Sequence, residues 1–108
     1  MAVVMSMEWP GVTLEEYDRI VELLDLEATP ADGGLFHVAG FEGGALRVVD
    51  IWESPEHFEQ FRDSRLMRAV QEAGLERGEP NVRVYEVYNH FRNPGVEIPE
   101  LGTARIAR

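Results

Sequence analysis

The first part of the chain carries a strand pattern followed by a helix pattern. Residues 2–8 are rich in Val and Met and predict a first strand. Thr13 is followed three residues later by Glu16, the spacing of a capping box at a helix N-terminus. Apolar residues then recur every three or four positions, which predicts an amphipathic helix that ends near Leu26.

Two β-rich runs, residues 35–41 and 45–52, flank the pair Gly43-Gly44. A glycine pair between two such runs is typical of a tight β-hairpin, because glycine adopts the positive φ angles of the turn. The turn also sets the register of the two strands. It places Phe36 opposite Ile51, His37 opposite Asp50, and so on toward the turn.

The second half of the chain repeats the helix and strand patterns. Ser54 followed by Pro55 predicts the start of a second helix, since serine caps helix N-termini and proline is tolerated in the first turn. This helix is expected to end at Gly74, with a break at Asp63-Ser64. Residues 82–91 predict a last strand.

The resulting order is βαββαβ, the split βαβ arrangement of ferredoxin-like domains. We therefore expect one α+β domain over residues 1–91 with a four-stranded antiparallel sheet. Residues 92–108 contain prolines, glycines and scattered apolar residues without a periodic pattern. They are expected to form an extended C-terminal tail.

The hairpin register also predicts what each face of the sheet carries. One face is wholly apolar, with Phe36 opposite Ile51 and Val38 opposite Val49, and is expected to carry the helices. The pairs expected on the other face are Leu35 with Trp52, His37 with Asp50, Ala39 with Val48, and Phe41 with Leu46. Because this second face is also largely apolar, we expect a second copy of the sheet to cover it. The homodimer would form an α+β barrel around a small-molecule cavity, and a charge at Val48 would split it.

Composition narrows the classes of partner and chemistry. The 108 residues include 20 acidic and 10 basic side chains, a formal net charge of −10, which disfavours nucleic acid and anionic membranes as partners. There is no cysteine, so disulfides and thiolate chemistry are excluded. No apolar run is long enough to span a membrane and no signal-peptide pattern is present, so a cytoplasmic protein is expected.

His37 opposite Asp50 is the strongest candidate for chemistry. A carboxylate bonded to an imidazole fixes its tautomer and raises its basicity, so His37 is a candidate general base with Asp50 as its orienter. The alternative is a polar cross-strand pair that only helps to set the register. Trp52 is expected to form a wall for a flat ligand, and Tyr88 to position that ligand with its hydroxyl group. The other side chains expected to bind substrate are Leu35, Phe41, Val48 and Glu86.

No cofactor or metal site is predicted. The three histidines do not have the spacing of a metal motif. Both glycine pairs precede strands rather than helices, so neither is a phosphate-binding loop. Any catalysis is therefore expected to proceed without a bound cofactor.

The stretch H-V-A-G-F-E-G-G-A-L-R-V-V-D-I-W-E-S-P-E-H-F from His37 to Phe58, with Y-N-H-F near the end, resembles the dimeric α+β barrel proteins grouped with antibiotic-biosynthesis monooxygenases. Its most specific part is the W-E-S-x-E segment that enters a helix. The resemblance covers residues 1–91 and implies the dimeric barrel fold. Cofactor-independent oxygenases of this group use a Trp, which Trp52 matches, to hold a polycyclic phenol that itself reacts with oxygen.

These observations lead to two hypotheses about function. The first is a cofactor-independent enzyme that acts on a small aromatic or polyketide-like molecule, as a monooxygenase or as a proton-transferring isomerase or cyclase. The second is a non-catalytic barrel protein that binds a hydrophobic metabolite or only dimerises. The first predicts a hollow beside His37, and the second predicts that side chains fill this space.

Overall fold

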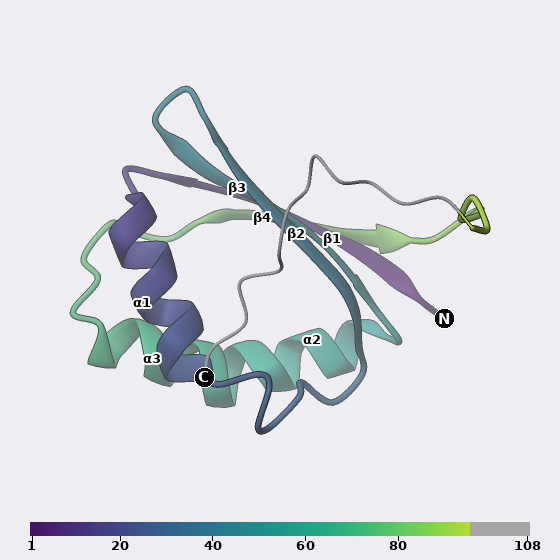
Figure 1. Ribbon diagram of the computed structural model, residues 1–108, viewed down its shortest axis with the longest axis horizontal. Helices are drawn as coiled ribbons and strands as arrows, with labels where there is room; N and C mark the ends of the chain where they lie inside the picture. The colour runs from purple at the N-terminus through teal and green to yellow at the C-terminus, as the bar shows by residue number, and fades with distance from the viewer. Residues whose placement is uncertain (96–108) are drawn as a thin grey trace.

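The computed structural model describes residues 1–95, which form a four-stranded antiparallel sheet with the helices on one side of it (Figure 1). The elements along the chain are β1 (Val3–Pro10), α1 (Leu14–Leu24), β2 (Gly34–Glu42), β3 (Ala45–Trp52), α2 (Pro55–Phe61), η1 (Arg62–Leu66), α3 (Met67–Glu72) and β4 (Asn81–Glu86). The strands lie in the order β2-β3-β1-β4. The predicted α+β class with βαββαβ order is confirmed. Residues 96–108 of the expected tail lie outside the described residues.

Both helical segments begin at the predicted caps. The Thr13 hydroxyl accepts a hydrogen bond from the Glu16 N–H (3.1 Å), and the Glu16 carboxylate accepts one from the Thr13 N–H (2.9 Å), so the capping box is complete. The Ser54 hydroxyl accepts from the His57 N–H at the start of α2 (3.1 Å). At the predicted break the second helix continues through one π-helical turn, η1, into α3.

The hairpin register is confirmed from Phe36 to the turn. Phe36 lies opposite Ile51 and His37 lies opposite Asp50. A bulge between Gly34 and Phe36 then places Gly34, and not Leu35, opposite Trp52, so the predicted pairing of Leu35 with Trp52 is wrong. The extra residue of a bulge has no partner across the ladder, which a register counted from the turn does not reveal.

The helices cover the opposite face of the sheet from the one predicted. The central strand β1 explains this difference. Every second residue of β1 is buried and lies opposite a residue of the predicted open face; the pairs are Val3 with Trp52, Met5 with Asp50, Met7 with Val48, and Trp9 with Leu46. These side chains form the core under the helices together with Val12 and Phe58. Both faces of the hairpin are apolar, so the hairpin alone does not select the buried one. β1 does, because its alternate positions include Ser6 and Glu8.

The face without helices is therefore the one that carries Phe36, Val38, Val49 and Ile51. Arg47 lies on the same face, in ion pairs with Glu8 (2.7 Å) and Glu42 (3.2 Å). Phe36, Val38 and Val49 remain 63%, 43% and 41% exposed on it. Val48, the residue chosen from the sequence to disrupt a dimer, is instead buried in the helix-side core. Among the described residues, no helix has the length and apolar character required to cross a membrane.

The last strand is shorter than predicted. β4 ends at Glu86, whereas the pattern extended to Phe91. The Val87 N–H still donates to the Ala2 carbonyl (3.0 Å), just before β1 begins at Val3. The chain leaves the sheet at this point, and Tyr88 is fully exposed.

Candidate functional site

The predicted hydrogen bond between His37 and Asp50 is present. The His37 Nδ1 lies 2.6 Å from the Asp50 Oδ1. Asp50 is buried, while the side chain of His37 is 47% exposed at the edge strand β2. Both point toward the helices, so the predicted location of this pair between two facing sheets is wrong.

Trp52 completes the surroundings of the Asp50 carboxylate. Its indole N–H donates to the Asp50 Oδ2 (3.2 Å). An indole nitrogen can only donate, and an ionised carboxylate can only accept, so the two Asp50 oxygens receive Trp52 Nε1–H and His37 Nδ1–H. In the neutral imidazole the proton therefore lies on Nδ1, and Nε2 keeps its lone pair.

Tyr17 joins this group from α1 and was not among the predicted site residues. Its hydroxyl lies 2.7 Å from the His37 Nε2, to which the phenol donates when the imidazole is neutral. The Tyr17 and His37 rings are nearly parallel, at 5° with centroids 6.2 Å apart, and Phe41 meets Tyr17 edge-on at 6.3 Å. Tyr17 also packs against the hydrophobic core, which holds its ring in place. Its place on the apolar face of the predicted helix, with a hydroxyl that needs a partner, was the available signal.

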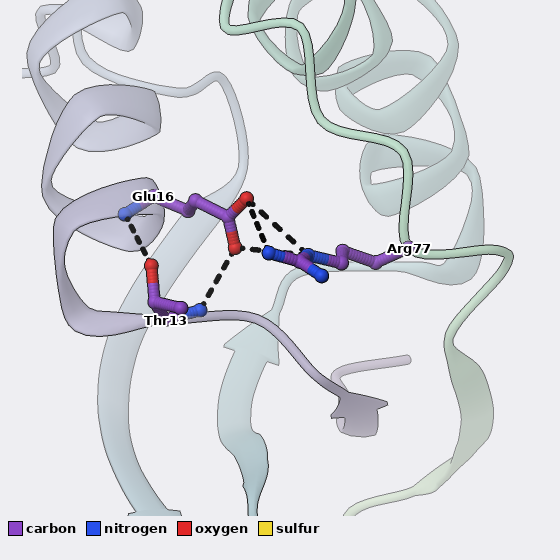
Figure 2. Close-up of polar contacts among 3 residues, drawn as sticks. All are labelled: Thr13, Glu16 and Arg77. Atoms are coloured by element: carbon purple, nitrogen blue, oxygen red, sulfur yellow. Dashed lines mark hydrogen bonds and ion pairs between the residues drawn. The ribbon is translucent and has the colours of Figure 1, made fainter.

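The start of α1 is held by a residue that is distant in sequence, in the loop between α3 and β4. Figure 2 shows the Arg77 guanidinium reaching the Glu16 carboxylate that also closes the capping box with Thr13. The Arg77 Nε and Nη2 each lie 3.2 Å from a Glu16 oxygen. The Thr13 N–H and then Arg77 hold the pKa of Glu16 below its ordinary value of 4.5. Because Tyr17 follows Glu16 directly, this anchor fixes the helical turn that carries the phenol.

The loop between α1 and β2, which leads to His37, is fixed by two contacts. The Arg65 guanidinium donates to three carbonyls at the end of α1 and in the loop, those of Leu24 (2.9 Å), Thr29 (2.6 Å) and Pro30 (3.2 Å). Gly33 has a φ of +79° and lies against the His57 ring so closely that a Cβ atom would stand 2.4 Å from it. Only glycine fits this position without displacing α2 or the loop.

The remaining predicted substrate-binding residues divide into two groups. Phe41 and Val48 lie on the same side of the sheet as His37, but Val48 is buried in the core and only Phe41 is accessible. Leu35 is exposed at the bulge, and Glu86 lies opposite Val3 on β4, with β1 and β3 between it and β2. Tyr88 lies beyond the sheet. The structure therefore does not bring these last three side chains to His37.

Trp52 does not form an open wall. Its side chain is 3% exposed and lies between Phe58 and Phe61, with ring centroids 5.8 and 5.2 Å away. It was expected on a free sheet face, but the β1 register places it in the core. Its contact with the site is the hydrogen bond to Asp50.

The structure shows a shallow hollow between α1 and the η1–α3 segment, lined by Leu23, Leu24, Arg65, Arg68, Ala69 and Glu72. It shares no lining residue with the group around His37. Within residues 1–95 no cluster of three or more His, Asp or Glu side chains has the geometry to hold a metal ion. The hydrogen-bonded side chains of Tyr17, His37 and Asp50 can transfer a proton along this series.

No protein-family model and no curated protein matches the sequence. Solved structures do match the fold. Rv0793 from Mycobacterium tuberculosis has a TM-score of 0.62 at 13% identity, over 83% of this chain and 98% of its own. A Deinococcus radiodurans protein described as a candidate antibiotic biosynthesis monooxygenase has a TM-score of 0.56 at 10% identity, over 88% and 100% of the two chains.

SnoaB from Streptomyces nogalater, described as a cofactor-independent oxygenase, has a TM-score of 0.60 at 8% identity, over 85% of this chain and 98% of its own. These likenesses extend over nearly the whole of each matched structure. The chain therefore has the fold of antibiotic-biosynthesis-monooxygenase-like proteins, as the sequence resemblance implied. At such low identity the likeness establishes the fold and leaves the activity to be argued from the site.

Proposed function

We propose that this chain is a cytoplasmic small-molecule enzyme of the cofactor-independent monooxygenase type. The observation that carries the proposal is the hydrogen-bonded series Tyr17, His37, Asp50 and Trp52, which gives a half-exposed imidazole a fixed tautomer and a buried carboxylate partner. His37 is the proton acceptor and Asp50 orients it and stabilises its charged form. The description of SnoaB, which shares the fold, as a cofactor-independent oxygenase supports the same class.

The proposed substrate is an aromatic or polyketide-like molecule with an acidic methylene group. Removal of one methylene proton by the site leaves a carbanion that is delocalised over the aromatic rings. The carbanion supplies the electrons that reduce dioxygen: the CH₂ group becomes C=O, and the second oxygen atom leaves as water. An isomerase or cyclase would use the same proton transfer and consume no oxygen.

The site lies on the helix side of β2, and this location differs from the dimer cavity expected from the sequence. The aromatic surfaces available there are those of Tyr17 and Phe41, which take the place that was assigned to Trp52. A flat substrate has its methylene group near the Tyr17–His37 hydrogen bond when it stacks at this edge of the sheet.

A homodimer through the open face is part of the proposal. Phe36, Val38, Val49 and Tyr85 are exposed there, with Val4 and Ile51 half-buried among them. A monomer would hold this apolar surface in water, which is costly, and a second copy of the same sheet offers a surface of matching shape and chemistry. The partner then stabilises the sheet from the side opposite to His37.

A non-catalytic protein is the second candidate, and two observations favour it. The hollow found among the described residues lies between α1 and the η1–α3 segment and not beside His37. Both ring nitrogens of His37 already have hydrogen-bond partners, as in a polar pair that serves only to hold α1 on β2. In this case the edge of β2 binds a hydrophobic metabolite without converting it, or the chain only dimerises.

Dioxygen uptake with a dihydroxyanthrone as the probe distinguishes the candidates. If the protein is an enzyme, dioxygen uptake should exceed the spontaneous rate and form the quinone. His37→Ala should then lower the rate of uptake by about 10²–10⁴-fold. The far-ultraviolet circular dichroism of the variant should be unchanged, because His37 lies at the edge of the sheet. Saturable binding of the probe without turnover would identify a binding protein, and neither binding nor turnover would leave only the structural role.

A further inference from the structure

We infer that Tyr17 is the residue that exchanges the proton with the substrate, and that His37 acts through it. The inference rests on the proposed function and assigns the contacting group within the same site. It follows from the hydrogen bonds of the imidazole, the chemistry of a phenol and the way in which α1 holds the ring.

Both nitrogens of His37 are occupied by protein partners. Asp50 lies on Nδ1 at 2.6 Å and the Tyr17 hydroxyl lies on Nε2 at 2.7 Å. Asp50 is buried and, as a carboxylate, receives Trp52 through its other oxygen. A substrate therefore reaches the proton-accepting nitrogen only by displacing Tyr17 or by way of its oxygen.

Displacement of Tyr17 is opposed by its surroundings. The phenol is hydrogen-bonded end to end with the His37 ring, and its own ring meets Phe41 edge-on and packs against the core. The helical turn beneath it is closed by the capping box and tied to Arg77. Moving the phenol away would break its hydrogen bond to His37 and its packing against Phe41 and the core, whereas a proton transfer through the phenol leaves these contacts in place.

A phenol oxygen that donates its own proton keeps lone pairs with which to accept another. As the substrate methylene proton moves to the Tyr17 oxygen, the Tyr17 hydroxyl proton moves to the His37 Nε2. The substrate becomes a carbanion, Tyr17 stays neutral, and His37 becomes an imidazolium paired with the Asp50 carboxylate. No charge is left on the phenol, and the positive charge forms next to the buried carboxylate that stabilises it.

The test is hydrogen–deuterium exchange of the methylene group of a dihydroxyanthrone in D₂O under argon, followed by NMR. This assay reads the proton transfer alone, because no dioxygen is present. Tyr17→Phe keeps the ring and its packing against Phe41 and the core and removes only the oxygen. Tyr85→Phe is the matched control, since it removes the same atom from the open face of the sheet.

The protein is expected to accelerate exchange above the buffer rate, Tyr17→Phe to lose about 10²–10⁴-fold of that acceleration, and Tyr85→Phe to keep it. Full exchange in Tyr17→Phe would show that His37 acts directly and would overturn the inference. No acceleration in the unaltered protein would overturn it as well. Exchange that depends on Tyr17, without dioxygen uptake in air, would confirm the relay and refute the monooxygenase.

Discussion

Replacing Asp50 by asparagine should reverse the direction of both His37 hydrogen bonds while keeping the shape of the site. The two Asp50 oxygens receive the Trp52 Nε1–H and the His37 Nδ1–H. An amide offers one oxygen and one NH₂ group. Because the indole can only donate, the amide oxygen must face Trp52, and the NH₂ group then faces the His37 Nδ1.

His37 in Asp50→Asn must therefore accept at Nδ1 and carry its proton on Nε2. The Nε2–H then donates to the Tyr17 oxygen, so the phenol no longer has a base to receive its proton. We expect a loss of about 10²–10⁴-fold in probe turnover. The nitrogen-15 shifts of the His37 ring report the change directly: Nε2 is the unprotonated nitrogen in the unaltered protein, and Nδ1 is in the variant.

The stability cost of this change is moderate. Hydrogen bonds to charged groups contribute about 1.5–3 kcal/mol and neutral ones about 0.5–1.5 kcal/mol, so two contacts that lose the charge cost about 2 kcal/mol in the free energy of unfolding. For a domain of this size that lowers Tm by roughly 8–16 °C. Asp63→Asn, the same chemical change at an exposed position, should leave the free energy of unfolding nearly unchanged, because an exposed ion pair contributes little. A His37 that keeps its proton on Nδ1 in Asp50→Asn would refute the reasoning.

Three further predictions concern the dimer, α1 and the loop before β2. Val49→Asp should give a folded monomer in sedimentation, because Val49 lies on the open face, whereas Val48→Asp should unfold the chain by placing a charge in the core. Arg77→Gln should raise the pKa of Glu16 toward its ordinary value, while the Thr13 N–H still holds it down. The variant therefore loses part of the stability that the Glu16 carboxylate gives the folded protein above about pH 4.5, and its Tm falls less steeply as the pH decreases below that value. Gly33→Ala should lower the free energy of unfolding by more than about 1 kcal/mol, measured by urea denaturation.

Each of these predictions has a result that contradicts it. A Val49→Asp protein that stays dimeric would place the interface elsewhere. If the Tm of Arg77→Gln falls with decreasing pH in the same way as it does in the unaltered protein, the ion pair does not stabilise α1. Gly43→Ala controls for backbone strain, because Gly43 also has a positive φ but has no atom within 4 Å of its Cβ position. An equal cost at Gly33 and Gly43 would show that the close approach to His57 contributes nothing.

The part of the fold that local sequence signals control was predictable. Thr13 with Glu16 and Ser54 with Pro55 mark helix starts through side-chain bonds that span three residues, and both starts were predicted correctly. Gly43-Gly44 sets the hairpin register by its own geometry, and His37 lies opposite Asp50 as a result. Each of these features depends on residues that are close together in the sequence.

What could not be predicted depends on contacts between distant segments. The choice of the buried face comes from β1. Its register with β3 places the buried residue Val3 opposite Trp52, and the same alternation continues along the strand. The contact of Tyr17 with His37 requires that α1 lies over the edge strand. Arg77, which follows α3 and is distant in sequence, helps to fix this position through its ion pair with Glu16. Tyr88 fails as a site residue because β4 ends at Glu86 and Tyr88 lies beyond the sheet, fully exposed.

The account rests on a site at the helix side of β2, and contacts between the protons of a bound dihydroxyanthrone and the side chains of this strand test it most directly. His37 and Val38 are adjacent in the sequence but point to opposite faces of the sheet. Nuclear Overhauser effects from the probe to the rings of Tyr17, His37 and Phe41, and none to the Val38 and Val49 methyl groups, are predicted. Contacts with the Val38 and Val49 methyl groups instead would place the ligand on the open face and contradict the account.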